Sequence, residues 1–575
     1  MHHRSLAARM LCLMLPVAAG AQAKNPLKHA PQPTSPAITA GDLMTRLYIF
    51  ADDSMMGRAA GTIYNNKGTD YIASELRKLG IQPAGDSGTY FQSIPLATLN
   101  VSTTKPLMVG DQAFYGFKDF IPRLPHNFGG EAIVYGGTFG DTNMISPVAA
   151  AGRIVLLTTP LGANGKPTWN NMRQPVQARY ARTANAVWLV GMSGMMPADM
   201  APLRDVGQAI VLDPTKPEDV MSPFGFGYVT NEMAEAMMGA PLAGMKVGTV
   251  GKTMSGLASF DTVRAPARNV IAIIPGSDPR LRGQYVALGG HNDHVGFQQG
   301  AVDHDSVRAF NMVARQEGAE EPAMNLTPEM NAAFHHILDS LHKDHPTRRD
   351  SIFNGADDDG SGSMAVLEIA EYFAKSPTKP KRSLLFVWHT GEELGLLGSE
   401  YFTEHPTVPR DSIVAQLNMD MIGRGEASDV TGHVMRMGGA GPAEGAVIHG
   451  NPDYLQLVGS RRLSTELGDL IEKVNKTETR PLNLDYSIDA NGHPANIYCR
   501  SDHYMYARFG IPITFFTTGG HADYHQLTDE PAYISYDHYA RVTNFVKDIA
   551  TAVANLDHRI VVDKPKPDPN GMCRQ

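Results

Sequence analysis

Three consecutive aspartates stand in the stretch FNGADDDGSGSMAV, residues 353–366, between glycines and ahead of a helix-like run. Crowding three carboxylates costs free energy through like-charge repulsion unless a cation lies among them. The same residues could instead form a solvated acidic turn that caps the helix, with an aspartate as the N-cap. The two interpretations differ in whether other parts of the chain supply partners for a metal ion.

Four other segments place histidine or carboxylate side chains directly after a strand-like run. They are HNDH at 291–294, GEELG at 391–395, Asp420 at the end of IVAQLNMD, and HADYHQLTD at 521–529. Each has an ordinary explanation when taken alone, such as a buried histidine, an acidic first helical turn, a cap or a surface histidine. Ligands of an open α/β sheet gather beyond the carboxyl ends of its strands, so five such segments at one rim favour a metal site. Imidazole and carboxylate ligands suit Zn²⁺ and related divalent ions.

The elements that must position these side chains are predicted by an alternation of strand-like and helix-like runs from residue 267 onward. This alternation is typical of an α/β sheet. A polar, partly helical segment, residues 297–352, interrupts it between the HNDH segment and the acidic run. The segment must leave and return near the rim of the site, and long insertions of this kind often act as lids or binding loops. We therefore expect it to shape access to the site.

A chain of 575 residues is too long for one ordinary core, so two or more domains are expected. Residues 126–262 contain short strand-like runs separated by Gly and Pro, which indicates a compact inserted unit. The helical pattern of residues 41–125 is assigned to the N-terminal part of the main domain, and residues 263–560 to its remainder. Residues 24–40 are predicted to be a flexible segment and residues 561–575 a C-terminal tail.

The first residues have the pattern of a secretory signal peptide, with a basic start, a short apolar run and an AQA cleavage signal at 21–23. Residues 1–23 are therefore predicted to direct export to the periplasm or the extracellular space. The alternative of a membrane anchor is less favourable because the apolar run is short, and no later stretch is apolar enough to span a membrane. Export would permit a disulfide between Cys499 and Cys573, although the sequence leaves their pairing open. The net charge of -9, without a basic block, argues against nucleic acid as a partner.

The motifs HNDH, GADDDGSG, GEELG, NMDMIG and DYHQLTD, in this order, resemble those of the co-catalytic dizinc exopeptidase family. That family includes secreted bacterial leucyl-type aminopeptidases and is related to glutamate carboxypeptidases, glutaminyl cyclases and the transferrin receptor ectodomain. The resemblance covers roughly 267–555 and is weaker over 41–95, while 126–262 is similar to the protease-associated insert domain. It implies an α/β fold, namely a mixed-sheet peptidase domain with helices on both faces and a smaller, β-rich insert.

The resemblance implies two zinc ions per chain. In its terms His291 and Asp420 would bind one ion, Glu393 and His525 the other, and Asp358 would bridge both. It also implies that Asp293 orients His291 and that a cis peptide joins Asp358 to Asp359. Charge counting agrees, because three carboxylates, two Zn²⁺ and one bridging hydroxide sum to zero. That hydroxide would be the nucleophile, since zinc lowers the pKa of bound water to about 7.

Two further residues receive catalytic roles from the resemblance. Glu392 would act as general base and then general acid, and Tyr524 would help to stabilise the oxyanion. The function expected is a secreted zinc aminopeptidase acting on peptides. A carboxypeptidase, a glutaminyl cyclase and a non-enzymatic receptor-like ectodomain remain alternatives. Near the motifs Arg424 and Arg500 belong to no arginine cluster, which favours the aminopeptidase, because a carboxypeptidase must hold a free carboxylate. The preferred side chain and the oligomeric state stay open.

Overall fold

The chain forms two structural units in the computed structural model, which describes residues 23, 25–160, 173–191, 208–211, 221–265, 267–320, 325–344, 346–425, 430–431, 448–449 and 453–575. The larger unit comprises Met1–Ile94 with Pro266–Gln575, and the smaller unit is Pro95–Ala265. Except for Ala23, the predicted signal segment lies outside the described residues. None of the described helices combines the length and apolar character that a bilayer crossing requires.

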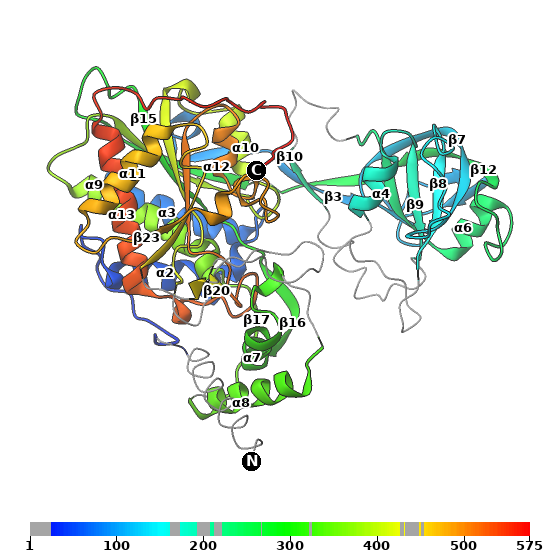
Figure 1. Cartoon of the computed structure of the whole chain (residues 1–575), viewed down its shortest axis with the longest axis horizontal. Helices are drawn as coiled ribbons and strands as arrows, with labels where there is room; N and C mark the ends of the chain where they lie inside the picture. Colours follow the sequence, from blue (N-terminus) through cyan, green and yellow to red (C-terminus); the bar gives the residue numbers. More distant parts are fainter. Residues whose placement is uncertain are drawn as a thin grey trace, which may run out of the picture. The chain divides into compact units, whose positions relative to one another are not determined.

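A mixed sheet of nine described strands forms the centre of the larger unit (Figure 1). The strand order is β1-β14-β18-β15-β19-β24-β22-β23, and β2 also pairs with β14. The neighbouring strands β18, β15, β19 and β24 run parallel, so their carboxyl ends lie at one edge. The strand bounds are β1 Gln82–Pro83, β2 Phe91–Ile94, β14 Ala267–Ile274, β15 Tyr285–His291, β18 Ser383–His389, β19 Ile413–Met419, β22 Tyr454–Val458, β23 Asn483–Asp485 and β24 Ile513–Thr517.

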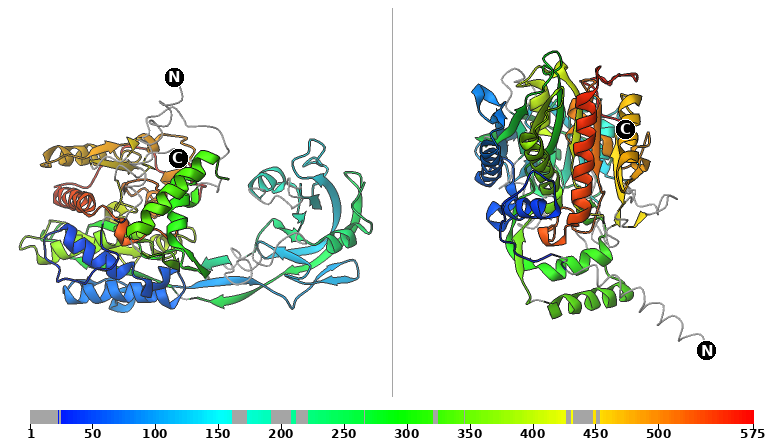
Figure 2. Two further views of the ribbon diagram at one scale, coloured as in Figure 1. Left: turned by 90° about the horizontal axis from the view of Figure 1, so that it is seen from below. Right: turned by 90° about the vertical axis from the view of Figure 1, so that its left-hand side faces the viewer.

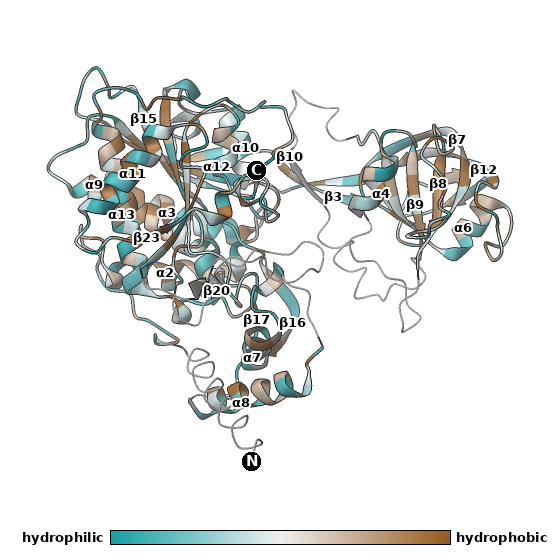
Figure 3. Ribbon diagram, viewed as in Figure 1, coloured by the Kyte–Doolittle hydropathy of each residue, from teal (hydrophilic) through white to brown (hydrophobic). Residues whose placement is uncertain are grey.

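Helices cover both faces of this sheet, as the turned views show (Figure 2). In β18 the side chains of Phe386 and Trp388 pack on one face, and those of Leu385 and Val387 on the other. This two-residue period with burial on both sides explains the continuous apolar runs of the central strands, which are brown in Figure 3. The first face is covered by α2 Ala40–Phe50, α3 Ile63–Lys78, α9 Gly362–Lys375, α11 Thr465–Thr477 and α13 Tyr536–Asn555, and the second by α10 Leu397–Glu404 and α12 His503–Ala507. The predicted mixed-sheet α/β fold is confirmed.

The insertion at residues 297–352 is a small structure of its own. Its first strand, β16 Phe297–Asp303, pairs antiparallel with its last, β17 Arg349–Ile352, so the chain leaves and returns side by side. Between them lie α7 His304–Ala314, the short turn η5 Gly318–Glu320 and α8 Pro328–Asp344 (Figure 1). Buried Ala309, Ile337 and Leu341 hold the two helices together.

The smaller unit is rich in β-structure and begins earlier than the sequence pattern indicates. Residues 95–125 were expected to belong to the peptidase domain, yet β4 pairs with β12 and β6 with β11, so the predicted boundary at 125/126 falls inside this unit. The likeness of the insert to a protease-associated domain stays a prediction. The elements are β3 Leu96–Val101, β4 Leu107–Val109, β5 Gln112–Phe114, β6 Phe120–Pro122, β7 His126–Thr138, β8 Ile154–Thr158, α4 Arg173–Tyr180, β9 Ala186–Val190, β10 Gln208–Val211, β11 Gly225–Val229, α6 Asn231–Met238, β12 Val250–Ala258 and β13 Phe260–Arg264.

Cys499 and Cys573, whose pairing the sequence left open, form a disulfide. It joins the C-terminal tail to the short η9 turn, Ile497–Cys499. The last residue, Gln575, also donates from its backbone N–H to Oδ1 of Asn496 at 3.1 Å. The tail is therefore fastened to a segment that immediately precedes Arg500 and Ser501.

Candidate metal centre

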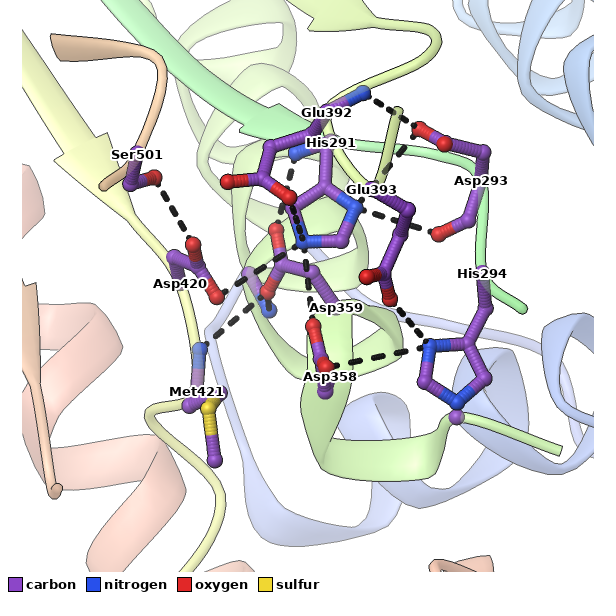
Figure 4. Close-up of polar contacts among 12 residues, drawn as sticks. His291, Asp293, His294, Asp358, Asp359, Glu392, Glu393, Asp420, Met421 and Ser501 are labelled. Carbon is purple, nitrogen blue, oxygen red and sulfur yellow. Dashed lines mark hydrogen bonds and ion pairs between the residues drawn. The ribbon is translucent and has the colours of Figure 1, made fainter. Parts of the chain in front are cut away.

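Four parallel strands end at the rim where the predicted site residues lie. Figure 4 shows several of these residues, among them His291, Asp358 and Asp420. His291 is the last residue of β15, and Asp420 directly follows β19. Glu392 and Glu393 follow β18, and the loop after β24 carries Tyr524 and His525. The acidic run lies in the turn η6, Ala356–Ser361, immediately before α9. The structure thus brings together side chains from five segments far apart in the sequence.

Asp358 lies between two histidines. Its Oδ1 is 3.1 Å from Nε2 of His291, and its Oδ2 is 2.9 Å from Nε2 of His525. Oε2 of Glu393 is 2.9 Å from the same nitrogen of His525, whereas Oδ1 of Asp420 is 3.7 Å from Nε2 of His291. Asp358 thus faces one histidine with each of its oxygens. The candidate ligand atoms fall into two groups, one of His294, Asp358, Glu393 and His525 and the other of His291, Asp359 and Asp420.

Asp293 and Asp359 position the neighbouring site residues through hydrogen bonds that involve backbone groups. Nδ1 of His291 lies 3.1 Å from the carbonyl oxygen of Asp293, and Oδ1 of Asp293 accepts a hydrogen bond from the backbone N–H of Glu392 at 3.3 Å. Oδ2 of Asp359 accepts from the backbone N–H of His291 at 2.9 Å, and its Oδ1 accepts from that of Gly362 at 2.8 Å. The peptide bond between Asp358 and Asp359 is cis, as the resemblance implies. Both oxygens of Asp359 accept backbone hydrogen bonds, and one of them also lies within 4.8 Å of the ligand-type atoms of His291 and Asp420.

The donor set fits a cation. Among the described residues, Nε2 of His291, Nε2 of His525 and Oδ2 of Asp358 are buried atoms without a well-oriented hydrogen bond, although the Asp358 carboxylate lies close to both nitrogens. Burial, reinforced by the charges of Asp420 and Glu393, raises the pKa of the Glu392 carboxyl well above its ordinary value. Negative charge is thus concentrated where water cannot solvate it, and bound divalent ions would relieve the repulsion.

His294, for which the sequence motifs predict no role, also lies among these side chains. Its Nδ1 lies 2.7 Å from Oε1 of Glu393, and its ring centroid is 5.4 Å from that of His525. The ligand-type atoms of His294, Asp358, Glu393 and His525 all lie within 4.8 Å of one another. The signal was present in the HNDH motif, but the resemblance assigned functions to only its first and third residues.

Two other supporting residues were missed. Arg58 is fully buried and donates to the carbonyl oxygens of Asn354 at 2.7 Å, Gly355 at 2.9 Å and Asn292 at 3.2 Å, so one guanidinium ties together two turns that carry candidate ligands. The Asp529 carboxylate accepts from the backbone N–H groups of Asp357 and Asp358, at 3.0 and 3.1 Å to its Oδ2. Only the DYHQLTD motif included one of them, without indicating its contacts.

A pocket opens beside the centre. Its lining includes the predicted catalytic residues Glu392 and Tyr524 and the candidate ligands Asp358 and Asp420. The Tyr524 ring stacks on the His525 imidazole with centroids 4.1 Å apart. The pocket wall also includes the apolar residues Met421, Ile488, Ala495, Ile497 and Phe515 and the charged residues Glu317, Glu320 and Arg500. The glutamates come from the 297–352 insertion, which therefore reaches the pocket.

Residues 324–550 match the family described as Peptidase family M28. This region of the chain is an M28 peptidase domain. The match contains Asp358, Glu392, Glu393, Asp420, Tyr524 and His525, while His291 and Asp293 precede it. The predicted relationship to the zinc exopeptidases is thereby confirmed.

Among curated proteins, leucine aminopeptidase 1 of Aspergillus oryzae is 30% identical over 210 residues, which are 34% of this chain and 47% of the relative. A probable zinc metalloprotease of Pyrenophora tritici-repentis is 39% identical over 77 residues, 13% of this chain and 17% of that protein. The chain thus spans about half the length, or less, of the curated relatives it matches. Among solved structures, the aminopeptidase of Aneurinibacillus sp. strain AM-1 aligns with a TM-score of 0.46 and 15% identity, over 92% of this chain and 97% of that one.

Proposed function

We propose that the protein is an exported, zinc-dependent aminopeptidase that binds two zinc ions and removes N-terminal residues from peptides. The observation that carries the proposal is the position of Asp358, whose two carboxylate oxygens face two different histidines. One carboxylate shared in this way suits a pair of divalent cations. The M28 match and the leucine aminopeptidase relative support the same conclusion.

The residues that would hold zinc are His291 and Asp420 in one half-site, Glu393 and His525 in the other, and Asp358 between them. His294 lies in hydrogen-bonding reach of Glu393 and would fix the orientation of that carboxylate. The hydroxyl group of Ser501 donates a hydrogen bond to Oδ2 of Asp420 at 2.7 Å, while Oδ1 of Asp420 points toward His291. When bound, zinc would polarise the scissile carbonyl and lower the pKa of water.

Glu392 would transfer the proton during hydrolysis. It lines the pocket beside His291, with its Oε2 4.0 Å from Nε2 of that residue, and belongs to neither half-site. A carboxylate at this position can accept a proton from water and deliver it to the leaving amine. Tyr524 faces the same pocket, where its hydroxyl group can donate a hydrogen bond to the oxyanion that forms on the substrate.

The charges around the pocket favour an aminopeptidase over a carboxypeptidase. Recognition of a free carboxylate calls for available arginines, yet Arg424 forms a buried ion pair with Asp523 at 2.8 Å, and Arg500 pairs with Glu320. Three carboxylates of the centre and two more from the insertion line the same pocket. This environment suits a substrate that carries a free ammonium group.

The test uses one peptide in two forms, N-acetylated and C-amidated, analysed by mass spectrometry with and without a chelator. We expect the amidated form to lose residues from its N-terminus, the acetylated form to survive, and both to survive in chelator. The variant Glu392→Gln serves as the catalytically impaired control. Sequential loss from the C-terminus of the acetylated peptide would identify a carboxypeptidase, and cyclisation of an N-terminal glutamine without hydrolysis would identify a glutaminyl cyclase.

A further inference from the structure

The 297–352 insertion supplies two carboxylates to the pocket that the metal centre does not use. Glu317 directly precedes the η5 turn, Gly318–Glu320, and Glu320 ends it. Glu317 is 5% exposed, so its carboxylate is largely withdrawn from bulk water. Both glutamates line the same pocket as Asp358 and Glu392.

The η5 turn is fixed against the loop that carries the candidate ligand His525. The backbone N–H of Ala319 donates to the carbonyl oxygen of Tyr524 at 3.0 Å. Gly318 has a positive φ of 55°, and a Cβ atom there would come within 2.3 Å of the same carbonyl oxygen. A side chain at this position would push the turn away from Tyr524, so glycine permits the close approach.

Glu320 is also tied to the opposite wall. It forms an ion pair with Arg500, whose neighbour in the sequence, Ser501, donates to Asp420. The turn is therefore attached at two residues, Tyr524 and Arg500. Tyr524 precedes the candidate ligand His525 in the sequence, and Arg500 precedes Ser501, which contacts Asp420. The glutamates line the same pocket as Asp358, whose buried Oδ2 has no well-oriented hydrogen bond among the described residues.

We propose that Glu317 and Glu320 bind the α-ammonium group of the peptide, so that the insertion sets the requirement for a free N-terminus. This inference rests on the proposed aminopeptidase function and names the group that the site recognises. The α-nitrogen is two bonds from the scissile carbonyl carbon, so its receptor must lie in the pocket that holds the reacting centre, and both glutamates line that pocket. Of the described residues that line the pocket, Arg500 is the cation, and it pairs with Glu320; an ammonium group would bring a second positive charge to the carboxylates of the lining.

The apolar wall of the pocket indicates which side chain the N-terminal residue of the substrate carries. Ile488, Ala495, Ile497 and Phe515 line the pocket together and suit an apolar side chain on the residue to be removed. The alternative is that the two glutamates bind the side chain of an N-terminal lysine or arginine. The position of the η5 turn against Tyr524 favours the α-ammonium group, because a side-chain cation would lie several bonds farther from the carbonyl.

The experiment compares the zinc-loaded parent with Glu317→Gln, Glu320→Gln and the double variant, using Glu329→Gln in α8 of the same insertion as the matched control. Calorimetry measures binding of L-leucine and of 4-methylpentanoate, which lacks the amine. Charge-assisted hydrogen bonds support an expected loss of about ten- to hundred-fold in leucine affinity, with little change for 4-methylpentanoate. The control should retain the parent's preference for leucine.

Three outcomes would overturn the inference. Equal losses for both ligands would mean that Glu320 acts only by holding Arg500, and in that case Glu320→Gln would add nothing to Arg500→Gln. Unchanged leucine binding in correctly folded variants would remove the glutamates from recognition. A loss of turnover confined to lysyl and arginyl substrates would assign them to the side chain. A parent without metal-dependent peptidase activity would instead refute the proposed function, so the two failures are distinguishable.

Discussion

Arg308 donates hydrogen bonds to both carboxylate oxygens of Asp523, each at 2.7 Å, and both side chains are buried. Arg308 belongs to α7 of the insertion, and Asp523 lies two residues before His525. On the other side Arg424 donates to Oδ2 of Asp523 at 2.8 Å. A buried ion pair thus links the insertion to the loop that carries a candidate metal ligand.

Replacing Arg308 by Met should loosen this link without unfolding the sheet. Asp523 would keep Arg424 but lose two charge-assisted hydrogen bonds, which would destabilise the insertion by about 2–3 kcal/mol. We expect faster hydrogen exchange in α7 and in residues 521–529, and a larger rise in KM for long peptides than for single-residue chromogenic substrates. Arg349→Met, at an exposed position of the same insertion, is the control. Unchanged exchange in both segments would show that the ion pair does not brace the loop.

Metal content should distinguish the shared carboxylate from an unshared one. Asp358 faces both histidines, whereas Asp420 faces His291, so Asp358→Asn should lose both zinc ions and Asp420→Asn mainly one. An amide in place of the shared carboxylate would leave two cations under-neutralised. Elemental analysis after dialysis measures the ratio of zinc to protein, with circular dichroism to verify folding. Two zinc ions retained by Asp358→Asn would place the bridging group elsewhere, with Asp357 the first candidate.

Glu392→Gln should separate metal binding from proton transfer. The glutamine is nearly isosteric, and Glu392 belongs to neither group of ligand-type atoms, so the zinc content should equal that of the parent. Turnover should fall by about 10²–10⁴, the range typical of general acid–base groups. Both quantities are to be measured on one preparation. Parent-like turnover with full zinc would exclude Glu392 as the proton carrier.

Chelation provides the broadest check of the mechanism. Removing the metal with EDTA or phenanthroline should abolish peptide hydrolysis, and adding Zn²⁺ or Co²⁺ should restore it, because the proposed hydrolysis uses water activated by the bound metal. Activity and elemental composition are followed through one cycle of removal and reconstitution. Full activity in a verified metal-free sample would contradict the dizinc proposal.

Local sequence signals predicted the part of the site that follows strand ends. The buried run Ser383–His389 and the acidic turn at Asp358 can be recognised without the fold, because each depends on residues close together in the chain. Long-range supports cannot be recognised in this way. Arg58 contacts the carbonyl of Gly355 across 297 positions, and Asp529 accepts from Asp357 across 172. Such contacts depend on how distant loops meet, which neither composition nor periodicity encodes.

The smaller unit begins earlier in the chain than the sequence predicts, and the reason is again a contact between residues far apart in the sequence. The segment Leu107–Val109 is short, and its place in the sheet depends on pairing with Met254 and Ser255, far along the chain. A three-residue strand carries little periodic signal of its own. The insertion shows the complementary case, because the sequence predicted that it returns to the rim, whereas the two glutamates that it brings into the pocket became visible only in the structure.

A second ion pair, between Glu530 and Arg348 of the insertion, predicts how the free energy of unfolding changes with pH. Glu530 accepts from Arg348 through both oxygens, at 2.8 and 2.6 Å, and lies 3.5 Å from Nε2 of His304. Burial alone would raise the pKa of Glu530, but His304 and Arg348 outweigh it and lower the pKa to about 2 from an ordinary 4.5. A depressed carboxyl pKa contributes stability above the unfolded-state pKa and loses it as the pH falls toward the folded-state value. A shift of this size corresponds to about 3 kcal/mol.

Glu530→Gln should therefore be most destabilising near neutral pH and progressively less so below pH about 4.5. Urea unfolding of parent and variant is measured from pH 6 to pH 2.5 at one metal loading, and the difference in free energy of unfolding is plotted against pH. Other carboxyl groups titrate in both proteins and largely cancel in this difference, and Glu329→Gln tests that cancellation with an exposed glutamate of α8. We expect the difference to shrink by about 2–3 kcal/mol over the range. A difference independent of pH would mean that the charge of Glu530 does not hold the insertion in place.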